Sequence, residues 1–265
     1  MRVRDTVHEA SADRDQEDRQ FITALARGLD ILDAFTPQDR MLGNQELAER
    51  TGLSKTTISR QTYTLTRLGY LIYLPRFAKY RLGFRAIALG QAALAGFDIR
   101  EIARPEMQRL SDDMQASVFL GSRDRDDIIF IEQCRPAVAV SLQLGIGSRV
   151  PIASTAIGRA YYALAKPAER AEIEATLSEK LAGDWPKLRK GLLEAADMYA
   201  ALGFTISLGE WNKAVNSAGA AFLLPSGGIM ALTCGAPAFM LPRDRLLQET
   251  GPRLAAAARQ IAALT

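Results

Sequence analysis

The stretch from Gln45 to Gly83, QELAERTGLSKTTISRQTYTLTRLGYLIYLPRFAKYRLG, decides the fold of the first part of the chain. Its pattern predicts a short amphipathic helix, a turn at Gly52, a second helix and a two-stranded ribbon. Glycine tolerates the positive φ that ends a helix, and the Ser54 hydroxyl is placed to cap the second helix. The sequence therefore predicts a helix-turn-helix followed by a wing at residues 70–82.

The second helix of this pattern has one apolar and several polar faces. Ile58, Leu65 and Leu68 recur at a roughly helical period, which predicts a single buried stripe. Its other side chains are suited to phosphates and base edges; they are Ser54, Lys55, Thr56, Thr57, Ser59, Arg60 and Gln61. Arg76 and Lys79 lie at the predicted tip of the wing, and we expect them to reach adjacent backbone phosphates.

The distribution of charge favours nucleic acid as the partner of this segment. Residues 50–97 contain eight basic residues and no acidic one. Residues 21–83 carry nine basic and five acidic residues, a net charge of +4, whereas residues 98–265 carry 19 of each sign. A basic face can be an ordinary solvated helix surface, but here it coincides with a helix-turn-helix pattern. We therefore predict that the chain binds double-stranded DNA.

The same stretch resembles the winged helix-turn-helix of the IclR family of bacterial transcriptional regulators. The shared motifs are ELA at 46–48, TGLSK at 51–55, Arg60, LGYL at 68–71 and YRLG at 80–83. Gln61 departs from the family pattern, in which an apolar residue is usual at this position. It is either a DNA contact or a sign that the helix is slightly rotated.

Composition excludes several classes of protein. A chain of 265 residues with 48% hydrophobic and 24% charged residues suits a globular protein of two domains or one large one. It contains no run of eighteen apolar residues, so we expect no membrane span, and residues 1–20 lack the apolar region of a signal peptide. Two cysteines, Cys134 and Cys234, indicate the reducing cytoplasm rather than a disulfide framework.

The single histidine, His8, lies in the polar segment 1–20, which we expect to be a flexible tail. Catalytic triads and zinc sites built on histidine are therefore unavailable. The sequence also has no GxxxxGK[ST] phosphate loop and no strand–GxGxxG–helix unit. We predict no catalytic site, no metal site and no cofactor. An enzyme fused to a DNA-binding domain and a DNA-architectural protein without a ligand stay open as alternatives.

The pattern along the chain predicts four segments: the tail 1–20, a winged helix-turn-helix domain 21–83, a linker helix 84–97 and a second domain 98–265. The first helix of the winged domain is expected at 21–35. Its expected buried face consists of Phe21, Ile22, Leu25, Leu29, Leu32 and Phe35. The linker helix is too apolar to stand alone in water, so we expect it to pack in a homodimer or a tetramer.

Beyond Ala116 the apolar pattern changes to short β runs. Strands are expected at 117–121, 128–133, 138–144, 204–208, 218–224 and 228–234, and helices at about 155–165, 167–181, 186–202 and 242–264. A mixed antiparallel sheet flanked by helices is an α+β architecture. The fold class predicted for the chain is thus α/β with two domains, an N-terminal winged helix-turn-helix and a C-terminal α+β domain.

The second domain resembles the GAF-like effector-binding domain of the same family. The resemblance lies in residues 147–151, 155–160, 209–211, 215–216 and 231–239. It departs from the family at Arg159, where lysine is usual, and at Tyr161 and Tyr162, where aliphatic residues are usual. The resemblance implies a transcriptional regulator that responds to a small effector. A dimer with one recognition helix per chain would read a palindromic operator.

The expected effector site is the start of the helix after Pro151. A helix N-terminus presents unsatisfied N–H groups and a positive dipole end, which suit a carboxylate. It is occupied here by Ser154, Thr155, Ala156 and Ile157, and the family match implies an opposite wall of Ser207, Ala218, Thr233 and Cys234. These small and hydroxyl side chains leave room for a small organic acid, including an aromatic one.

Three of the residues near this site have simpler interpretations. Thr233 and Cys234 can be ordinary buried strand residues, because cysteine often behaves as a small hydrophobe. Trp211 can be a pocket lid, a dimer contact or a residue with ordinary packing.

Overall fold

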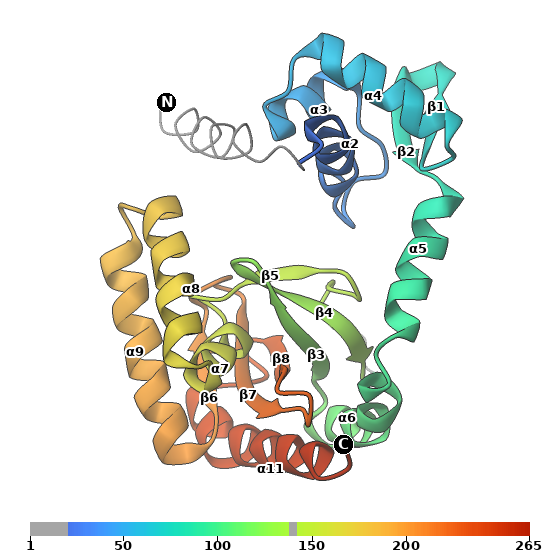
Figure 1. Ribbon diagram of the computed structural model, residues 1–265. Helices are drawn as coiled ribbons and strands as arrows, with labels where there is room; N and C mark the ends of the chain where they lie inside the picture. Colours follow the sequence, from blue (N-terminus) through green and yellow to red (C-terminus); the bar gives the residue numbers. More distant parts are fainter. Residues whose placement is uncertain (1–20, 138–141) are drawn as a thin grey trace. The chain divides into compact units, whose positions relative to one another are not determined.

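The computed structural model describes residues 21–137 and 142–265 (Figure 1). The chain divides into two compact units, of which the first ends at Gly96 and the second begins at Phe97. The first contains a two-stranded sheet and the second a six-stranded sheet. The predicted fold class, a winged helix-turn-helix followed by an α+β domain, is confirmed. Within the described ranges, no helix is both long enough and apolar enough to cross a membrane.

The first unit has the predicted order of elements. They are α2 (Thr23–Asp33), α3 (Asn44–Thr51), α4 (Lys55–Arg67), β1 (Leu71–Leu74), β2 (Lys79–Leu82) and α5 (Phe84–Ala95). β1 and β2 pair antiparallel and form the wing, with a 3-10 turn between them. Gly52 ends α3 at a left-handed φ of 71°, and the Ser54 side chain accepts the Thr57 N–H at the start of α4. The two local signals of the helix-turn-helix therefore act as predicted.

The face that α2 buries is not the predicted one. Phe21, Ile22, Leu25 and Leu29 are exposed, whereas Gly28 and Ile31 are buried. The physical reason is the close approach of α4 at Gly28. A Cβ on Gly28 would lie 3.3 Å from the Gln61 Oε1 atom, so the missing side chain lets Gln61 pack against this face. The expected stripe was therefore wrong at these four exposed residues, whereas Leu32 and Phe35 are partly buried against the core as predicted.

The buried stripe of α4 also differs from the expected one at a single position. Ile58 and Leu65 are buried as predicted, but Leu68 is half exposed. Thr62 is buried in its place, because its hydroxyl donates to the Ile58 carbonyl at 2.9 Å and is thereby satisfied. The core of the unit is completed by Leu42, Leu47 and Leu71.

The second unit is built on one antiparallel sheet of order β5-β4-β3-β8-β7-β6. Its strands are β3 (Ser117–Asp124), β4 (Asp127–Cys134), β5 (Arg149–Pro151), β6 (Thr205–Leu208), β7 (Val215–Leu223) and β8 (Ile229–Pro237). Most of the expected strands are present. Of the strand predicted at 138–144, residues 138–141 lie outside the described residues. Residues 142–144 have no regular secondary structure, so that part of the prediction was wrong.

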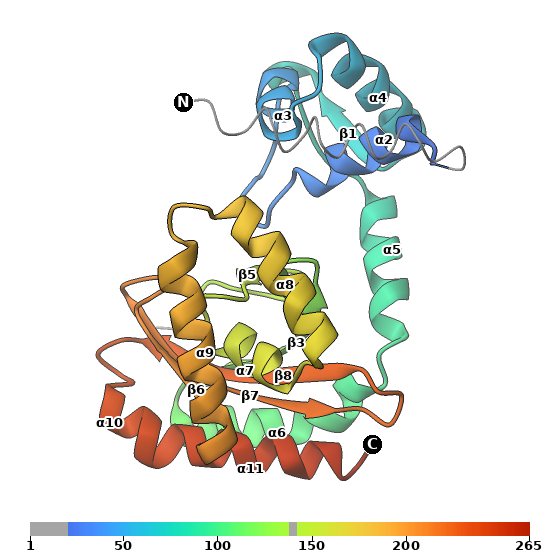
Figure 2. The same ribbon diagram turned by 60° about the vertical axis from the view of Figure 1, so that its left-hand side comes forward.

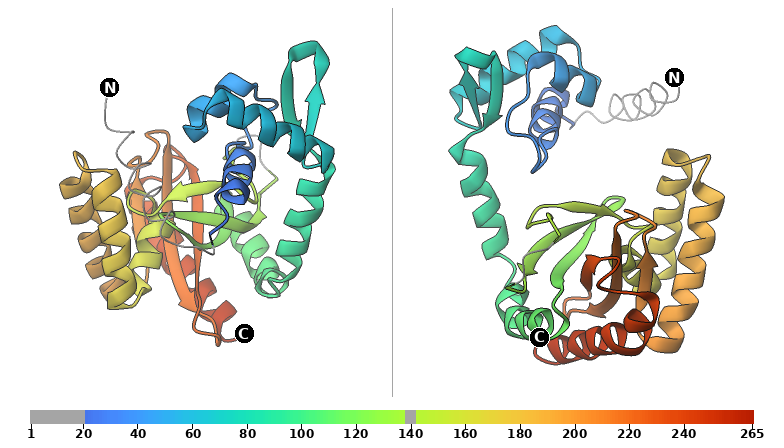
Figure 3. Two further views of the ribbon diagram at one scale, coloured as in Figure 1. Left: turned by 45° about the horizontal axis from the view of Figure 1, so that its top comes forward. Right: turned by 180° about the vertical axis from the view of Figure 1, so that it is seen from behind.

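Helices cover both faces of this sheet (Figures 2 and 3). α6 (Ile99–Met114) and α11 (Gly251–Ala262) lie on one face, and α7 (Ala156–Leu164) lies on the other. α8 (Pro167–Lys180) and α9 (Trp185–Leu202) pack outside α7. The helix predicted at 242–264 is divided into α10 (Arg243–Arg245), a π-helical segment at 246–250 and α11.

Two glycines bring the N-terminus of α7 against its neighbours. A Cβ on Gly219 of β7 would lie 2.2 Å from the Ala156 carbonyl oxygen, and one on Gly158 would lie 2.3 Å from the Ile152 Cα atom. Hydroxyls then fix the helix in place. Thr205 donates to the Ala156 carbonyl at 2.7 Å, and Ser207 donates to the Ser154 carbonyl at 2.9 Å. The start of α7 is therefore held firmly on β6 and β7.

Candidate functional site

The N-terminal half of α4 presents an exposed polar and basic surface. Lys55, Thr56, Ser59 and Arg60 are all exposed there. The Ser54 and Thr57 hydroxyls lie 2.9 Å apart and are bonded to each other within the helix cap. The free side chains of this surface thus combine two cations with two hydroxyls, which is the donor set that proteins use on phosphates and base edges.

Two of the predicted DNA-binding residues have partners inside the unit. The Gln61 amide donates to the Ala24 carbonyl at 3.1 Å and ties α4 to α2. The Lys79 ammonium lies 2.8 Å from the Glu46 carboxylate, and this bond lowers the pKa of Glu46. Arg76 is different, because it is exposed on the wing with its guanidinium 5.6 Å from the centre of the Phe77 ring.

Arg27 was not among the DNA-binding residues predicted from the sequence. A groove of about 400 Å³ runs between α2 and α4, and Arg27 and Arg60 both line it together with Thr23, Thr57, Gln61 and Thr64. Arg27 was overlooked because α2 was interpreted only as a core helix. The sequence carries no signal for it, because only the folded chain shows that the face of α2 with Thr23 and Arg27 borders α4.

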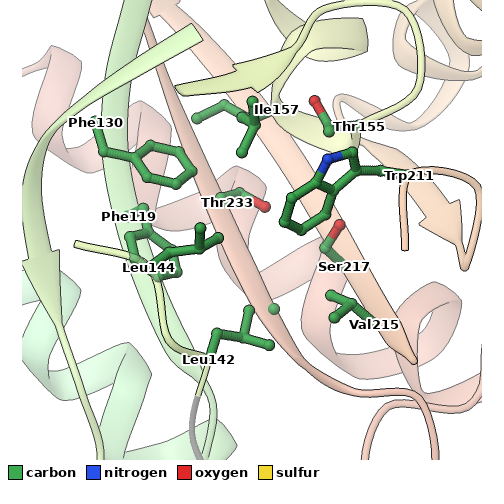
Figure 4. Close-up of a pocket in the computed structure, with 12 residues that line it drawn as sticks. Phe119, Phe130, Leu142, Leu144, Thr155, Ile157, Trp211, Val215, Ser217 and Thr233 are labelled. Atoms are coloured by element: carbon green, nitrogen blue, oxygen red, sulfur yellow. The ribbon is translucent and has the colours of Figure 1, made fainter. Parts of the chain in front are cut away.

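A second hollow lies between the start of α7 and the sheet of the second unit (Figure 4). Most of the side chains around it are apolar, namely Phe119, Phe130, Leu142, Leu144, Val150, Ile157, Trp211 and Val215. The polar ones are the hydroxyls of Thr155, Ser217 and Thr233, and Gly235 completes the lining. No charged side chain borders the hollow among the described residues. Its free volume is about 30 Å³, which is room for a water molecule but not for an organic ring.

Three of the eight predicted effector residues border this hollow, and five do not. Thr155, Ile157 and Thr233 line it. Ser154, Ala156 and Ser207 lie beside it and are engaged in the hydrogen bonds that hold α7 on the sheet.

Ala218 and Cys234 pair with each other between β7 and β8. Their strand neighbours Ser217 and Thr233 line the hollow, so alternation turns Ala218 and Cys234 toward the other face. Cys234 is fully buried there, and burial raises the pKa of its thiol to about 12. The thiol is therefore neutral and acts as a small apolar side chain.

Ser117 was not predicted and has unusual surroundings. It lies two residues before Phe119 on β3 and opposite Gly235 of β8, so its side chain shares the face that bears the hollow. It is buried, and its hydroxyl has no hydrogen-bond partner in the described part of the chain. A buried unpaired hydroxyl costs about 1–3 kcal/mol. Strand alternation around Phe119 is the signal that could have identified it.

Two family models match the chain. The model described as "IclR helix-turn-helix domain" matches residues 24–75, and "Bacterial transcriptional regulator IclR C-terminal" matches residues 91–263. The chain is 31% identical over 238 residues to the HTH-type transcriptional regulator TsaQ1/TsaQ2 of Comamonas testosteroni, which covers 88% of this chain and 85% of that protein.

Solved structures show the same architecture. The crystal structure of an IclR family transcriptional regulator from Brucella abortus superposes with a TM-score of 0.84 at 39% identity and covers 95% of both chains. An IclR homologue from Microbacterium hydrocarbonoxydans, solved with 4-hydroxybenzoate, has the same fold with a TM-score of 0.66 at 23% identity, over 91% of this chain and 98% of that chain. The C-terminal family model alone matches more than half of the residues. The chain therefore belongs to the IclR family of DNA-binding transcriptional regulators with an effector-binding C-terminal domain.

Proposed function

We propose that this protein binds a palindromic operator as a homodimer, and that a small organic acid bound at the start of α7 modulates this binding. The observation that carries the proposal is the exposed surface of Lys55, Thr56, Ser59 and Arg60 on the second helix of a helix-turn-helix. The second helix of this motif enters the major groove with its N-terminal residues on base edges. Arg60 and Ser59 would read bases, whereas Lys55, Arg27 and Arg76 would contact phosphates.

Replacing Arg76 with alanine should weaken binding to operator and to unrelated DNA by similar factors. A phosphate contact carries no sequence information. Without this contact, the binding of each chain to DNA releases one counterion fewer. The slope of log affinity against log salt should therefore become shallower by about 0.9 per chain. Fluorescence anisotropy with both DNAs at several salt concentrations measures this slope. A loss confined to the operator would show that Arg76 reads bases instead.

The hollow at α7 has the chemistry of a site for a small acid with an apolar body. The Gly158 N–H is bonded to the Thr155 hydroxyl, which leaves the preceding N–H of the helix start, at the lining residue Ile157, for a carboxylate. Aromatic and aliphatic side chains surround the rest of the hollow. The homologue from Microbacterium hydrocarbonoxydans was solved with 4-hydroxybenzoate, and we propose an acid of similar size for this chain.

A thermal-shift series with benzoate, 4-hydroxybenzoate and pyruvate tests the effector site. A ligand at a hundred times its Kd should add about 2.7 kcal/mol to the free energy of unfolding. Benzamide and benzyl alcohol are matched controls without a negative charge, and we expect weaker shifts from them. If no acid raises the melting temperature, the proposed ligand class is wrong. If a stabilising acid is chemically converted, the enzymatic alternative gains support.

The proposal of a homodimer rests on apolar surface that the chain leaves exposed. None of the side chains of α5 is buried, and Phe84, Ile87 and Leu89 are exposed, with Phe84 at 74%. A helix with such a surface needs a partner, because large exposed apolar patches mark interaction sites. A second copy of this chain supplies an identical helix and satisfies the two-fold symmetry of a palindromic operator.

Ile87→Glu should shift the protein from dimer to monomer at micromolar concentration. A carboxylate buried against a second α5 would lose its hydration without a partner charge. Gln38→Glu, at an exposed position outside α5, adds the same charge without touching the proposed interface and is the matched control. Sedimentation velocity measures the assembly, and circular dichroism checks that both variants are folded. A wild-type chain that sediments as a monomer would refute the homodimer.

A further inference from the structure

We infer that Trp211, held in position by Arg159 through Glu210, is the wall that sets the size of the acid accepted by the hollow at α7. The inference rests on the proposed function, because it concerns the same site. Arg159 and Glu210 act on the ligand only through Trp211, so they are positioning residues.

The Arg159 guanidinium is held in one position between α7 and α9. Its side chain is only 7% exposed. Its Nε atom donates to the Ala153 carbonyl at 3.0 Å, and Nη1 donates to the Ile206 carbonyl at 3.4 Å. On the α9 side the missing side chain of Gly191 makes the room, since a Cβ there would lie 2.8 Å from the Arg159 Nη2 atom. The backbone of three elements therefore determines where this cation lies.

Glu210 is held by both arms of this guanidinium. Nη1 donates to Oε1 at 2.9 Å, and Nη2 donates to Oε2. A two-armed contact of this kind fixes the orientation of a carboxylate as well as its position. Arg159 is buried and Glu210 is 43% exposed, so the removal of the Glu210 charge would weaken the two-armed contact that orients the turn.

The turn that carries Glu210 transmits this anchor to Trp211. Gly209 adopts a left-handed φ of 68° and its N–H donates to the Val215 carbonyl at 3.1 Å. The Val215 N–H donates to the Asn212 carbonyl at 2.8 Å, and the Ala214 N–H donates to the Asn212 side chain at 3.0 Å. A turn with so many internal bonds moves as one piece, so fixing Glu210 also fixes the adjacent Trp211.

Trp211 closes the hollow on the side of this turn. Its indole ring points at Thr233 and Ile157 (Figure 4). The deeper walls, Phe119, Phe130 and Ile157, are at most 2% exposed, whereas Trp211 is 37% exposed. The free volume of about 30 Å³ must grow several-fold for a ring, given that a cavity of about 150 Å³ accommodates benzene. Trp211 is the largest lining side chain and is partly exposed, so a rotation of its indole ring on the fixed backbone of the turn supplies the volume.

The first test needs no ligand. In a Trp185→Phe background, Trp211 is the only remaining tryptophan, and its quenching by acrylamide reports how firmly it is held. We expect Glu210→Gln to raise the quenching constant at least twofold. Glu249→Gln, which breaks the 3.0 Å pair with Arg245 in the same unit, should leave it unchanged. Unchanged quenching in a folded Glu210→Gln chain would show that the contact between Arg159 and Glu210 does not hold Trp211. If Trp185→Phe fails to fold, the wild-type signal minus that of Trp211→Phe gives the same quantity.

The second test concerns size. Trp211→Ala should shift the ratio of affinities for 2-naphthoate and benzoate at least tenfold toward 2-naphthoate, measured by calorimetry, with Trp185→Phe as the control. An unchanged ratio would overturn the role of Trp211. If the wild type binds neither acid, the proposed site for an aromatic acid fails and the size-setting role of Trp211 fails with it. The quenching result still decides separately whether Arg159 and Glu210 hold the turn.

Discussion

Replacing Arg60 with alanine will lower the affinity for the operator by about 1–3 kcal/mol, while binding to unrelated DNA will fall much less. Arg60 is exposed in the second turn of α4, on the surface that the helix-turn-helix geometry turns toward the major groove. An arginine in this position can bond two acceptors of a guanine edge at once, which is the commonest specific contact. Anisotropy titrations with a selected operator and with scrambled DNA measure both affinities.

Two variants make this result interpretable. Arg67→Ala removes the same charge from the exposed last turn of the same helix and should cost little specificity. Arg60→Lys keeps the charge but cannot form the planar two-armed contact, so it should behave like alanine toward the operator. If Arg60→Ala binds the operator as tightly as the wild type, Arg60 does not contact bases, and another residue of this surface must do so.

Gly219→Ala will destabilise the second unit by about 3 kcal/mol or more, at the upper end of the cost of overpacking. The added methyl group would lie 2.2 Å from the Ala156 carbonyl oxygen, and its other near neighbours are also backbone atoms of α7. No side-chain rotation can relieve such a clash, so the start of α7 must move away from β7. Differential scanning calorimetry should show a lower melting temperature for this unit, and acid binding should be lost at temperatures where the variant is still folded.

Gly183→Ala is the matched control for this experiment. Gly183 belongs to the same unit, and a Cβ there would meet no heavy atom within 4 Å. We expect a change within about 0.5 kcal/mol, as for an ordinary surface substitution. If Gly219→Ala melts like the wild type and binds acid equally well, the contact between α7 and β7 does not position the site.

Local signals in the sequence were sufficient for the helix-turn-helix. Gly52 and Ser54 act through their own neighbours, and the structure shows the turn and the cap that they predict. The exposed face of α2 could not be predicted in this way. Its amphipathic pattern indicates the more apolar face, but Gly28 allows Gln61 to pack on the opposite one. Packing between helices overrides periodicity here, because the space beside Gly28 is filled by Gln61, a residue distant in sequence.

The effector site also combines residues that local sequence could predict with residues that it could not. Thr155 and Ile157 were found because a helix start is recognisable from sequence and from family resemblance. Ala218 and Cys234 were matched to the wall without a fixed register, and a shift of one residue turns a side chain to the other face of a sheet. The pairing of Arg159 with Glu210 joins residues 51 positions apart. No local pattern in the sequence predicts such a contact, because only the folded chain brings the two residues together.

The measurement that tests ligand-regulated DNA binding most directly is the affinity of the acid with and without DNA. The acid that stabilises the protein most is titrated by calorimetry into the protein alone and into its complex with an operator duplex selected from random DNA. Thermodynamic linkage requires that DNA change the affinity for the acid by the same factor as the acid changes the affinity for DNA. We predict unequal acid affinities whose ratio equals the ratio of operator affinities with and without acid. Equal affinities would mean that the acid does not shift the DNA-binding equilibrium, which would contradict the regulatory role of the site.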